Sequence, residues 1–262
     1  MSVGFFSSDG GVNLVVAGER ESRVKTISHS RKFGPRQFLL GVAGVLFLAD
    51  LYLMLMVAPT DSVLGHVQRI FYFHVPIAVM SFLAFFVVFL ASVLFLVKRT
   101  PVWDRLAHAS AEVGVVLVTL ALITGIIWAR PIWNTWWTWE PRLTTTLILW
   151  LIYVAYLMIR SYAPSRQQGS IYAAVVGIVG FVDVPIVYYS VIWWRSIHPS
   201  PVVGPLAAAD ALNSTMLAVL LFSLLTFLVL FVYLVAERMA IRESEDKLRE
   251  VRLALRRAQA QT

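Results

Sequence analysis

The sequence contains no cysteine and few charged residues. The absence of cysteine excludes disulfides, thiolate metal sites and iron–sulfur clusters. Only 14% of the 262 residues are charged, whereas soluble domains contain about 25% charged residues. Hydrophobic residues make up 59% of the chain. This composition indicates an integral membrane protein rather than a soluble domain.

The sequence also lacks the features of a secretory signal peptide and of a nucleic-acid-binding surface. Residues 1–37 have no apolar core followed by a cleavage site with small residues, so we do not expect them to be a signal peptide. The net charge of +7 does not indicate nucleic acid, because the basic residues lie in the tails and beside the apolar runs.

Six apolar runs are long enough to cross a bilayer, which takes about 20 residues. They cover residues 38–58, 75–97, 107–128, 143–161, 170–194 and 211–236. The sequence therefore predicts an all-α integral membrane protein with one six-helix domain at residues 38–236. We expect residues 1–37 to be a mostly disordered tail. We expect residues 237–262 to continue the last helix, which would meet a partner subunit or the lipid surface, or would be exposed and frayed.

The distribution of basic residues predicts the orientation of the chain. Of the 22 Lys and Arg residues, 18 fall on the side of the two tails. Only Arg69, Arg130, Arg142 and Arg195 fall on the other side. Because short loops rich in Lys and Arg stay in the cytoplasm, we expect both tails to be cytoplasmic.

A tryptophan-rich segment follows the third predicted span, on the predicted outer face. Five of the nine Trp residues lie between Trp128 and Trp139, and Glu140 and Arg142 follow them. Trp prefers the membrane–water interface, so an interfacial belt is one interpretation. A platform for a large flat ligand is the other, because four Trp in seven positions beside an acid and an arginine exceed what a belt needs.

Two histidines lie on the same predicted face as the Trp-rich segment. His74 precedes Pro76 at the outer end of the second span, and His198 follows Trp194 in the last outer loop. Imidazole is a common axial ligand of haem iron, Trp faces suit a flat apolar ring, and Arg suits propionates. Each group also has an ordinary interpretation, because interfacial His is often a polar anchor and interfacial Arg often meets lipid phosphate.

These segments resemble the heme exporter protein C (CcmC) family of cytochrome c biogenesis. Residues 133–142 have the sequence Trp-Asn-Thr-Trp-Trp-Thr-Trp-Glu-Pro-Arg, which is similar to the family's tryptophan-rich WWD motif. Residues 73–76 and 189–198 resemble its two flanking histidine regions. The resemblance covers roughly residues 38–236. Asn134 stands where Gly is usual and Glu140 where Asp is usual.

The resemblance implies a haem-handling scaffold, not an enzyme, in the bacterial cytoplasmic (inner) membrane. Such a protein binds haem b at the outer face and presents it to a periplasmic haem chaperone (CcmE). It works beside the ATP-binding, permease and small membrane subunits (CcmA, CcmB and CcmD) of an ABC-type complex. This chain has no phosphate-binding Gly-rich loop, so ATP hydrolysis would belong to a partner.

The resemblance also assigns roles to individual residues. The expected iron ligands are His74 and His198, in preference to His66, which lies in the loop with no close aromatic neighbour. The expected haem-contacting residues are aromatic, acidic or basic side chains of the outer face: Trp128, Trp133, Trp136, Trp137, Trp139, Glu140, Arg142, Arg69, Arg195 and Trp194.

Two functions of other classes stay open at this point. A secondary transporter would need polar groups within the spans, and Asp50, Glu112 and Asp183 lie in or near them. A membrane redox subunit would hold a haem permanently, usually with ligands inside the helices.

Overall fold

The computed structural model describes residues 7–8, 11–12, 34–194, 196–202, 204–208 and 212–260. Most of the predicted N-terminal tail and Arg195 lie outside these residues. Within the tail, the short strands β1 (Ser7–Ser8) and β2 (Gly11–Val12) pair antiparallel.

Six helical segments are long and apolar enough to cross a membrane, which confirms the predicted all-α, six-span architecture. Their elements are α1 (Pro35–Tyr52) with the π-helix η1 (Leu53–Val57), the 3₁₀-helix η2 (His66–Ile70) with α2 (Phe71–Lys98), α3 (Pro101–Trp133), α4 (Pro141–Tyr162), α5 (Arg166–Gly180) with α6 (Asp183–Trp193), and α7 (Ser214–Gln259).

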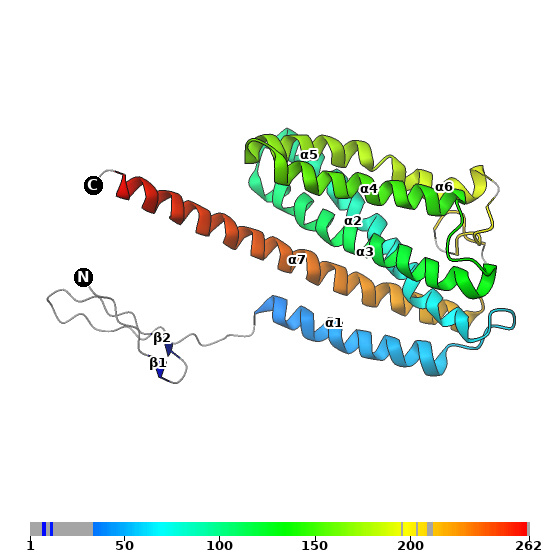
Figure 1. Cartoon of the computed structure of the whole chain (residues 1–262). Coiled ribbons are helices and arrows are strands. Elements are labelled where there is room, and N and C mark those ends of the chain that lie inside the picture. The colour runs from blue at the N-terminus through cyan, green and yellow to red at the C-terminus, as the bar shows by residue number, and fades with distance from the viewer. Residues whose placement is uncertain are drawn as a thin grey trace.

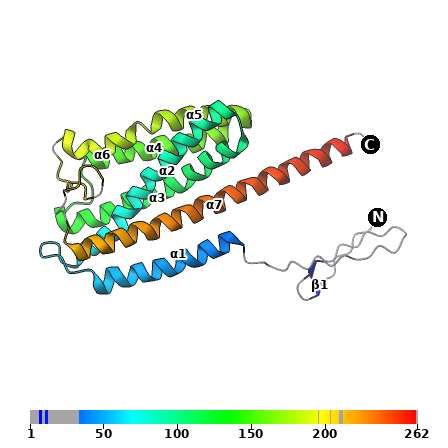
Figure 2. The ribbon, with the colours of Figure 1, turned by 180° about the vertical axis from the view of Figure 1, so that it is seen from behind.

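The helices form a bundle whose longer connecting loops gather at one end. Figures 1 and 2 show α2 to α6 as one group, with α7 beside it and α1 against α7 at the edge. The start of α1 and the end of α7 point to the same end of the bundle. The loops at 58–65 and 134–140, and the described residues between α6 and α7, lie at the opposite end, which we call the loop end.

Aromatic side chains fill the interior between these helices. Phe85 of α2 stacks on Tyr153 of α4 with ring centroids 3.7 Å apart, and both side chains are fully buried. Nearer the loop end, Tyr72 and Leu220 are buried where α2 meets α7. These contacts fix α2 between its neighbours, and α2 carries His74.

The helix boundaries differ from the predicted spans in three places. First, α2 begins at Phe71, so Pro76 lies inside the helix rather than in its first turn. Second, α3 continues to Trp133, so the Trp-rich segment starts on a helix and only residues 134–140 form a loop. Third, the fifth span is interrupted at Phe181 and Val182, between α5 and α6.

Helix α7 continues past its membrane-spanning part to Gln259 without a break. Glu112 of α3 binds this extension through Arg238, at 2.7 and 2.9 Å, and through Arg242. Asp246 forms ion pairs with Arg105 and Arg166. The extension is therefore attached to the bundle by charged side chains rather than by an apolar face.

Candidate functional site

A pocket lies at the loop end, between α2, α3, α4 and α6 and beneath residues 198–202. Its volume is about 170 Å³, and its lining is mainly apolar. Four residues predicted for the site line it: His74, Trp128, Arg142 and His198. The structure thus brings together two imidazoles and one guanidinium from segments far apart in the sequence.

His74 is oriented by the third helix. Its Nδ1 lies 2.9 Å from the hydroxyl of Thr124, and that hydroxyl lies 2.8 Å from the carbonyl oxygen of Leu120. A hydroxyl has a single hydrogen, and the carbonyl of Leu120 can only accept it. With the hydroxyl hydrogen on the carbonyl of Leu120, neutral His74 donates its Nδ1–H to Thr124 and leaves its Nε2 without a proton, which is the form that binds a metal.

The ring of His74 fits against α3 because residue 125 is glycine. A Cβ added at Gly125 would lie 3.1 Å from Cε1 of His74, closer than ordinary van der Waals contact. The ring of Trp128, also on α3, lies edge-on to His74, with centroids 5.7 Å apart. The indole nitrogen of Trp128 is buried and has no hydrogen-bond partner among the described residues.

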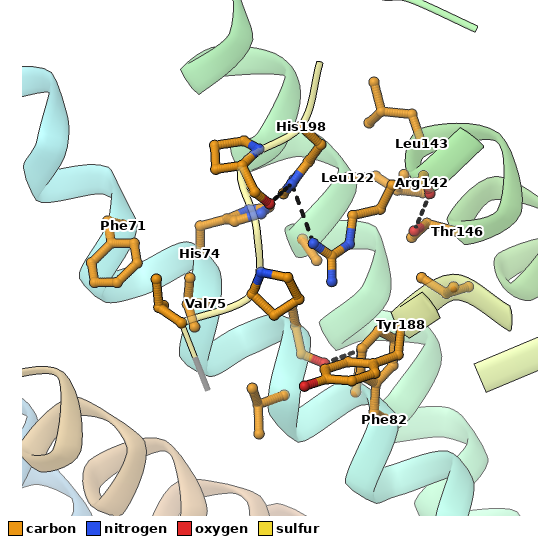
Figure 3. A pocket seen from close by; sticks show the side chains of 18 of the residues that line it. Phe71, His74, Val75, Phe82, Leu122, Arg142, Leu143, Thr146, Tyr188 and His198 are labelled. Carbon is orange, nitrogen blue, oxygen red and sulfur yellow. Dashed lines mark hydrogen bonds between the residues drawn. The ribbon is translucent and has the colours of Figure 1, made fainter. Parts of the chain in front are cut away.

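His198 lies beside Arg142, as Figure 3 shows. Its Nδ1 is 3.2 Å from Nη1 of Arg142 and 3.0 Å from the carbonyl oxygen of Pro199. Burial, together with the positive charge of Arg142, lowers the pKa of His198 from 6.5 to about 4. His198 is therefore neutral at pH 7, as an iron ligand must be.

Glu140 connects the Trp-rich loop to the segment that carries His198. One of its carboxylate oxygens accepts the backbone N–H of Leu143 at 2.8 Å and caps α4, and the other accepts the hydroxyl of Ser196. The Ser196 oxygen in turn accepts the backbone N–H of His198 at 3.1 Å. Glu140 is buried, so its interactions in this structure are with the protein rather than with solvent.

The tryptophans of the 134–140 loop are not among the described residues that line the pocket. Trp136 and Trp139 are 59% and 75% exposed, and the guanidinium of Arg130 lies 5.7 Å from the Trp136 ring. Trp137 contacts Trp139 edge-on. Trp133, at the end of α3, lies 6.3 Å from the ring of His198. Among the described residues that line the pocket, the only tryptophan is Trp128.

The backbone conformation at residue 134 explains why Asn can stand where the motif usually has Gly. Asn134 ends α3 in the left-handed conformation with φ of 54°. Gly and Asn are the residues that adopt this conformation most readily, so Asn134 serves where Gly is usual. Its side-chain oxygen also accepts a hydrogen bond from Arg130.

Two other predicted residues, Arg69 and Trp194, are not among the described residues that line the pocket. Arg69 and His66 lie in η2, and neither is among the described residues that line it. Trp194 is 49% exposed and packs edge-on against Trp193. Arg195 lies outside the described residues.

Sequence reasoning missed Thr124, Gly125 and Ser196, which position the two histidines. A Thr-Gly pair inside an apolar run was a visible signal, because both residues are poor fillers of a lipid-facing helix. Ser196 offered no signal, since its role depends on the loop bringing it to Glu140.

The acids considered for a transporter are dispersed. Asp50 is buried and accepts the hydroxyl of Ser223 at 2.7 Å, between α1 and α7. Glu112 is paired with arginines of the α7 extension, and Asp183 lies in the first turn of α6. None of the three is among the described residues that line the pocket.

The donor set of the pocket fits iron in a porphyrin better than a bare ion. Among the described residues, no group of three or more His, Asp or Glu could hold a metal ion. Two imidazoles supply only the axial positions, so the metal must bring its equatorial ligands with it, as haem iron does. The cavity is smaller than the roughly 300–1,000 Å³ of pockets that enclose a drug-sized ligand, so a porphyrin would extend beyond it.

Comparison with known proteins agrees with this chemistry. The family model for heme exporter protein C matches residues 25–253. A heme exporter protein C of Bradyrhizobium diazoefficiens is 36% identical over 196 residues, which cover 74% of each chain. The heme exporter protein C of Escherichia coli strain K12 is 32% identical over 182 residues, 70% of this chain and 73% of its own. A putative cytochrome c biosynthesis ccmC-like mitochondrial protein of Marchantia polymorpha is 36% identical over 162 residues, 62% of this chain and 68% of its own.

Proposed function

Because this chain belongs to the heme exporter protein C family, we propose that it handles haem for cytochrome c biogenesis as a multi-pass membrane protein. The observation that supports this most directly is the pocket at the loop end, where His74 and His198 lie with Arg142. Two neutral imidazoles and a cation above an apolar cavity match the iron, the propionates and the ring of haem.

In this proposal the ligand is haem b, and each residue at the loop end has a role. His74 and His198 would hold the iron. Arg142 meets a propionate, and Trp128 contacts the ring. Glu140 acts by holding the His198 segment, since both of its carboxylate oxygens already accept hydrogen bonds. Arg69, Arg195, Trp133 and Trp194 surround this centre and would meet parts of the ligand that extend beyond the cavity.

The proposed role is to present haem rather than to transform it. The pocket is too small to enclose a porphyrin, so one edge of the ring would stay accessible. Trp136, Trp137 and Trp139 stand above that edge, and two of them are largely exposed. This arrangement suits a scaffold that binds haem firmly and then passes it to a periplasmic chaperone similar to CcmE.

The proposed setting follows from charge and from the family. The loop end would face the periplasm and both tails the cytoplasm of a bacterium, with the chain in the cytoplasmic membrane. The α7 extension then lies in the cytoplasm, where its charged surface is accessible to the ATP-binding subunit (CcmA-like). CcmB-like permease and CcmD-like small subunits would complete the ABC-type complex.

An absorption spectrum of the purified protein, followed by mixing with apo-chaperone, tests the proposal. We expect bound low-spin haem that moves to the chaperone. No bound haem would favour a transporter, and haem that never leaves would favour a redox subunit.

A triple Trp136→Ala, Trp137→Ala, Trp139→Ala variant tests the exposed aromatic loop. Stacking of a flat ring on an aromatic side chain contributes about 1–3 kcal/mol, so we expect weaker haem-dependent binding of the chaperone with normal amounts of folded protein. Normal haem delivery by this variant would show that the loop is only an interfacial belt.

A further inference from the structure

Two hydrogen-bond partners compete for one nitrogen of His198. Nη1 of Arg142 and the carbonyl oxygen of Pro199 lie 3.2 and 3.0 Å from Nδ1. A guanidinium can only donate and a carbonyl can only accept, so Nδ1 of a neutral imidazole satisfies one partner at a time. The bond to Arg142 requires a bare Nδ1 and places the proton on Nε2. The bond to Pro199 requires Nδ1–H and leaves Nε2 bare.

The choice between these partners decides whether His198 can bind a metal. While Arg142 donates to Nδ1, that nitrogen faces a cation and Nε2 carries the proton, so neither nitrogen is available. His74 differs, because its Nδ1–H is taken by Thr124 and its Nε2 is bare. With Arg142 as the partner of Nδ1, the two imidazoles of the pocket are not equivalent: His74 is ready to bind iron, and His198 is not.

We propose that Arg142 is a carboxylate-operated lock on His198. Arg142 holds His198 in the tautomer that cannot bind metal until a carboxylate of the porphyrin takes the guanidinium. The proton of His198 then moves from Nε2 to Nδ1, which donates it to the carbonyl oxygen of Pro199. Nε2 is then free to bind the iron. This inference rests on the proposed function, because it assigns the order in which the residues of that site engage.

The chemistry of the partners favours the exchange. A carboxylate offers arginine two charged acceptors in a bidentate arrangement, whereas the imidazole offers one neutral nitrogen. The carbonyl of Pro199 is already within hydrogen-bond distance, so His198 needs only a proton shift and no large movement. The reverse exchange explains release, since loss of the carboxylate returns Arg142 to His198 and frees the iron.

The first test measures the tautomer of His198 in the haem-free, full-length protein. Histidine labelled with ¹⁵N distinguishes Nδ1–H from Nε2–H, and a His198→Gln variant identifies the resonance. We expect Nε2–H in the wild type and Nδ1–H in an Arg142→Met variant, which keeps an unbranched apolar side chain and removes the donor. An Nδ1–H tautomer in the wild type would overturn the lock, and this result does not depend on any Arg142 variant folding.

The second test compares iron protoporphyrin with its dimethyl ester, which lacks carboxylates. In the wild type we expect the free acid to give six-coordinate low-spin iron and the ester to give five-coordinate iron. The six-coordinate fraction should differ by about ten-fold or more, as expected for losing a hydrogen bond to a charged group. In Arg142→Met, the ester should also become six-coordinate.

The control is Arg130→Met, which removes an arginine of the same end of the bundle that pairs with Asn134 and Trp136. This variant should respond to the two porphyrins as the wild type does. Six-coordinate iron with both porphyrins in the wild type would refute the lock and leave the proposed function intact. Failure of both porphyrins to bind would instead refute the proposed function.

Discussion

At the scale of single residues, the position of His74 depends on a neighbour without a side chain. Gly125 allows the imidazole to lie against α3, and Thr124, one residue earlier, fixes the ring through its hydroxyl. The hydroxyl of Thr124 and the missing side chain of Gly125 thus set both the rotation and the tautomer of the His74 ring. Neither residue is among the described residues that line the pocket, yet both determine where Nε2 points.

A Gly125→Ala substitution tests this dependence. The added Cβ would approach Cε1 of His74 to 3.1 Å and push the ring from its position. A side chain forced from its rotamer costs about 0.5–1.5 kcal/mol, which is roughly two- to ten-fold in affinity. We expect haem affinity to fall by that factor, measured by titration, while the helix itself is not weakened.

The matched control is Gly44→Ala in α1, where an added Cβ meets no heavy atom within 4 Å in the described part of the chain. It should leave haem affinity unchanged. Equal affinities of the Gly125→Ala variant and the wild type would show that the close approach at His74 is not needed.

The protonation of His198 gives a second prediction at this scale. Its pKa is lowered to about 4 by burial and by Arg142, whereas the unfolded chain has a value near 6.5. Between these values the unfolded state binds the proton and the folded state does not. The contribution of His198 to stability is therefore present above pH 6.5 and is lost as pH falls toward 4.

An NMR titration of the haem-free protein checks this value, with His198→Gln to identify the signal. We expect the His198 resonance to stay constant from pH 7 to 5 and to move only near pH 4. A midpoint near 6.5 would contradict the account, because His198 would then be exposed to solvent rather than held beside Arg142.

At the scale of structural elements, Glu140 connects two loops that are far apart in the sequence. It caps α4 at Leu143 and holds Ser196, whose oxygen accepts the backbone N–H of His198. The acid of the motif therefore has a mechanical role: it sets the distance between the start of α4, which carries Arg142, and the segment of His198. A hydrogen bond to a charged group stabilises by about 1.5–3 kcal/mol, enough to fix a short loop.

The Glu140→Gln and Ser196→Ala variants, alone and combined, test this connection. Each single change should weaken haem binding by roughly ten-fold, the effect of losing one hydrogen bond of this kind. Because both changes break the same link, the double variant should bind haem about as weakly as whichever single variant has the lower haem affinity. Fully additive losses of binding free energy would mean that the two residues act independently.

The elements could be predicted from the sequence to the extent that hydropathy and charge determine them. The six spans follow from long apolar runs, and the proximity of Arg142 to Trp128 follows from the motif. The early start of α2 at Phe71 could not be predicted, because Pro76 resembles a helix start and its tolerance inside α2 depends on the surrounding packing. The Arg142–His198 contact was also beyond sequence reasoning, since it depends on how α4 and the last loop meet.

At the scale of the whole molecule, the two ends of the bundle carry different kinds of side chains. The loop end carries aromatic side chains, two imidazoles and a small apolar pocket. The opposite end carries ion pairs, including Arg160 with Asp104 at 2.7 Å, and the charged extension of α7. Haem chemistry at one end and partner contacts at the other would be joined by α7, which runs through both.

The orientation of the bundle is a prediction at this scale. The bias of 18 basic residues to four predicts that both tails lie in the cytoplasm. Reporters fused at residue 30 and at Thr262 should be active only in the cytoplasm. A periplasmic signal from either fusion would reverse the molecule and place the Trp-rich loop in the cytoplasm, away from a periplasmic chaperone.

The account of the site depends most on which residues bind the iron, and an absorption spectrum tests this directly. The proposal assigns the two bonds to His74 and His198 and none to His66, which lies in η2 away from the described lining of the pocket. The measurement is the absorption spectrum of haem bound to His74→Gly, His198→Gly and the double variant. His66→Gly serves as the control that should keep the wild-type spectrum.

We predict that each single variant at His74 or His198 loses the six-coordinate low-spin spectrum and that added imidazole restores it, because the freed position accepts the small ligand. The double variant should show no low-spin haem until imidazole is added. A full low-spin spectrum of the double variant without imidazole would contradict the account, since the iron would then be held by other residues.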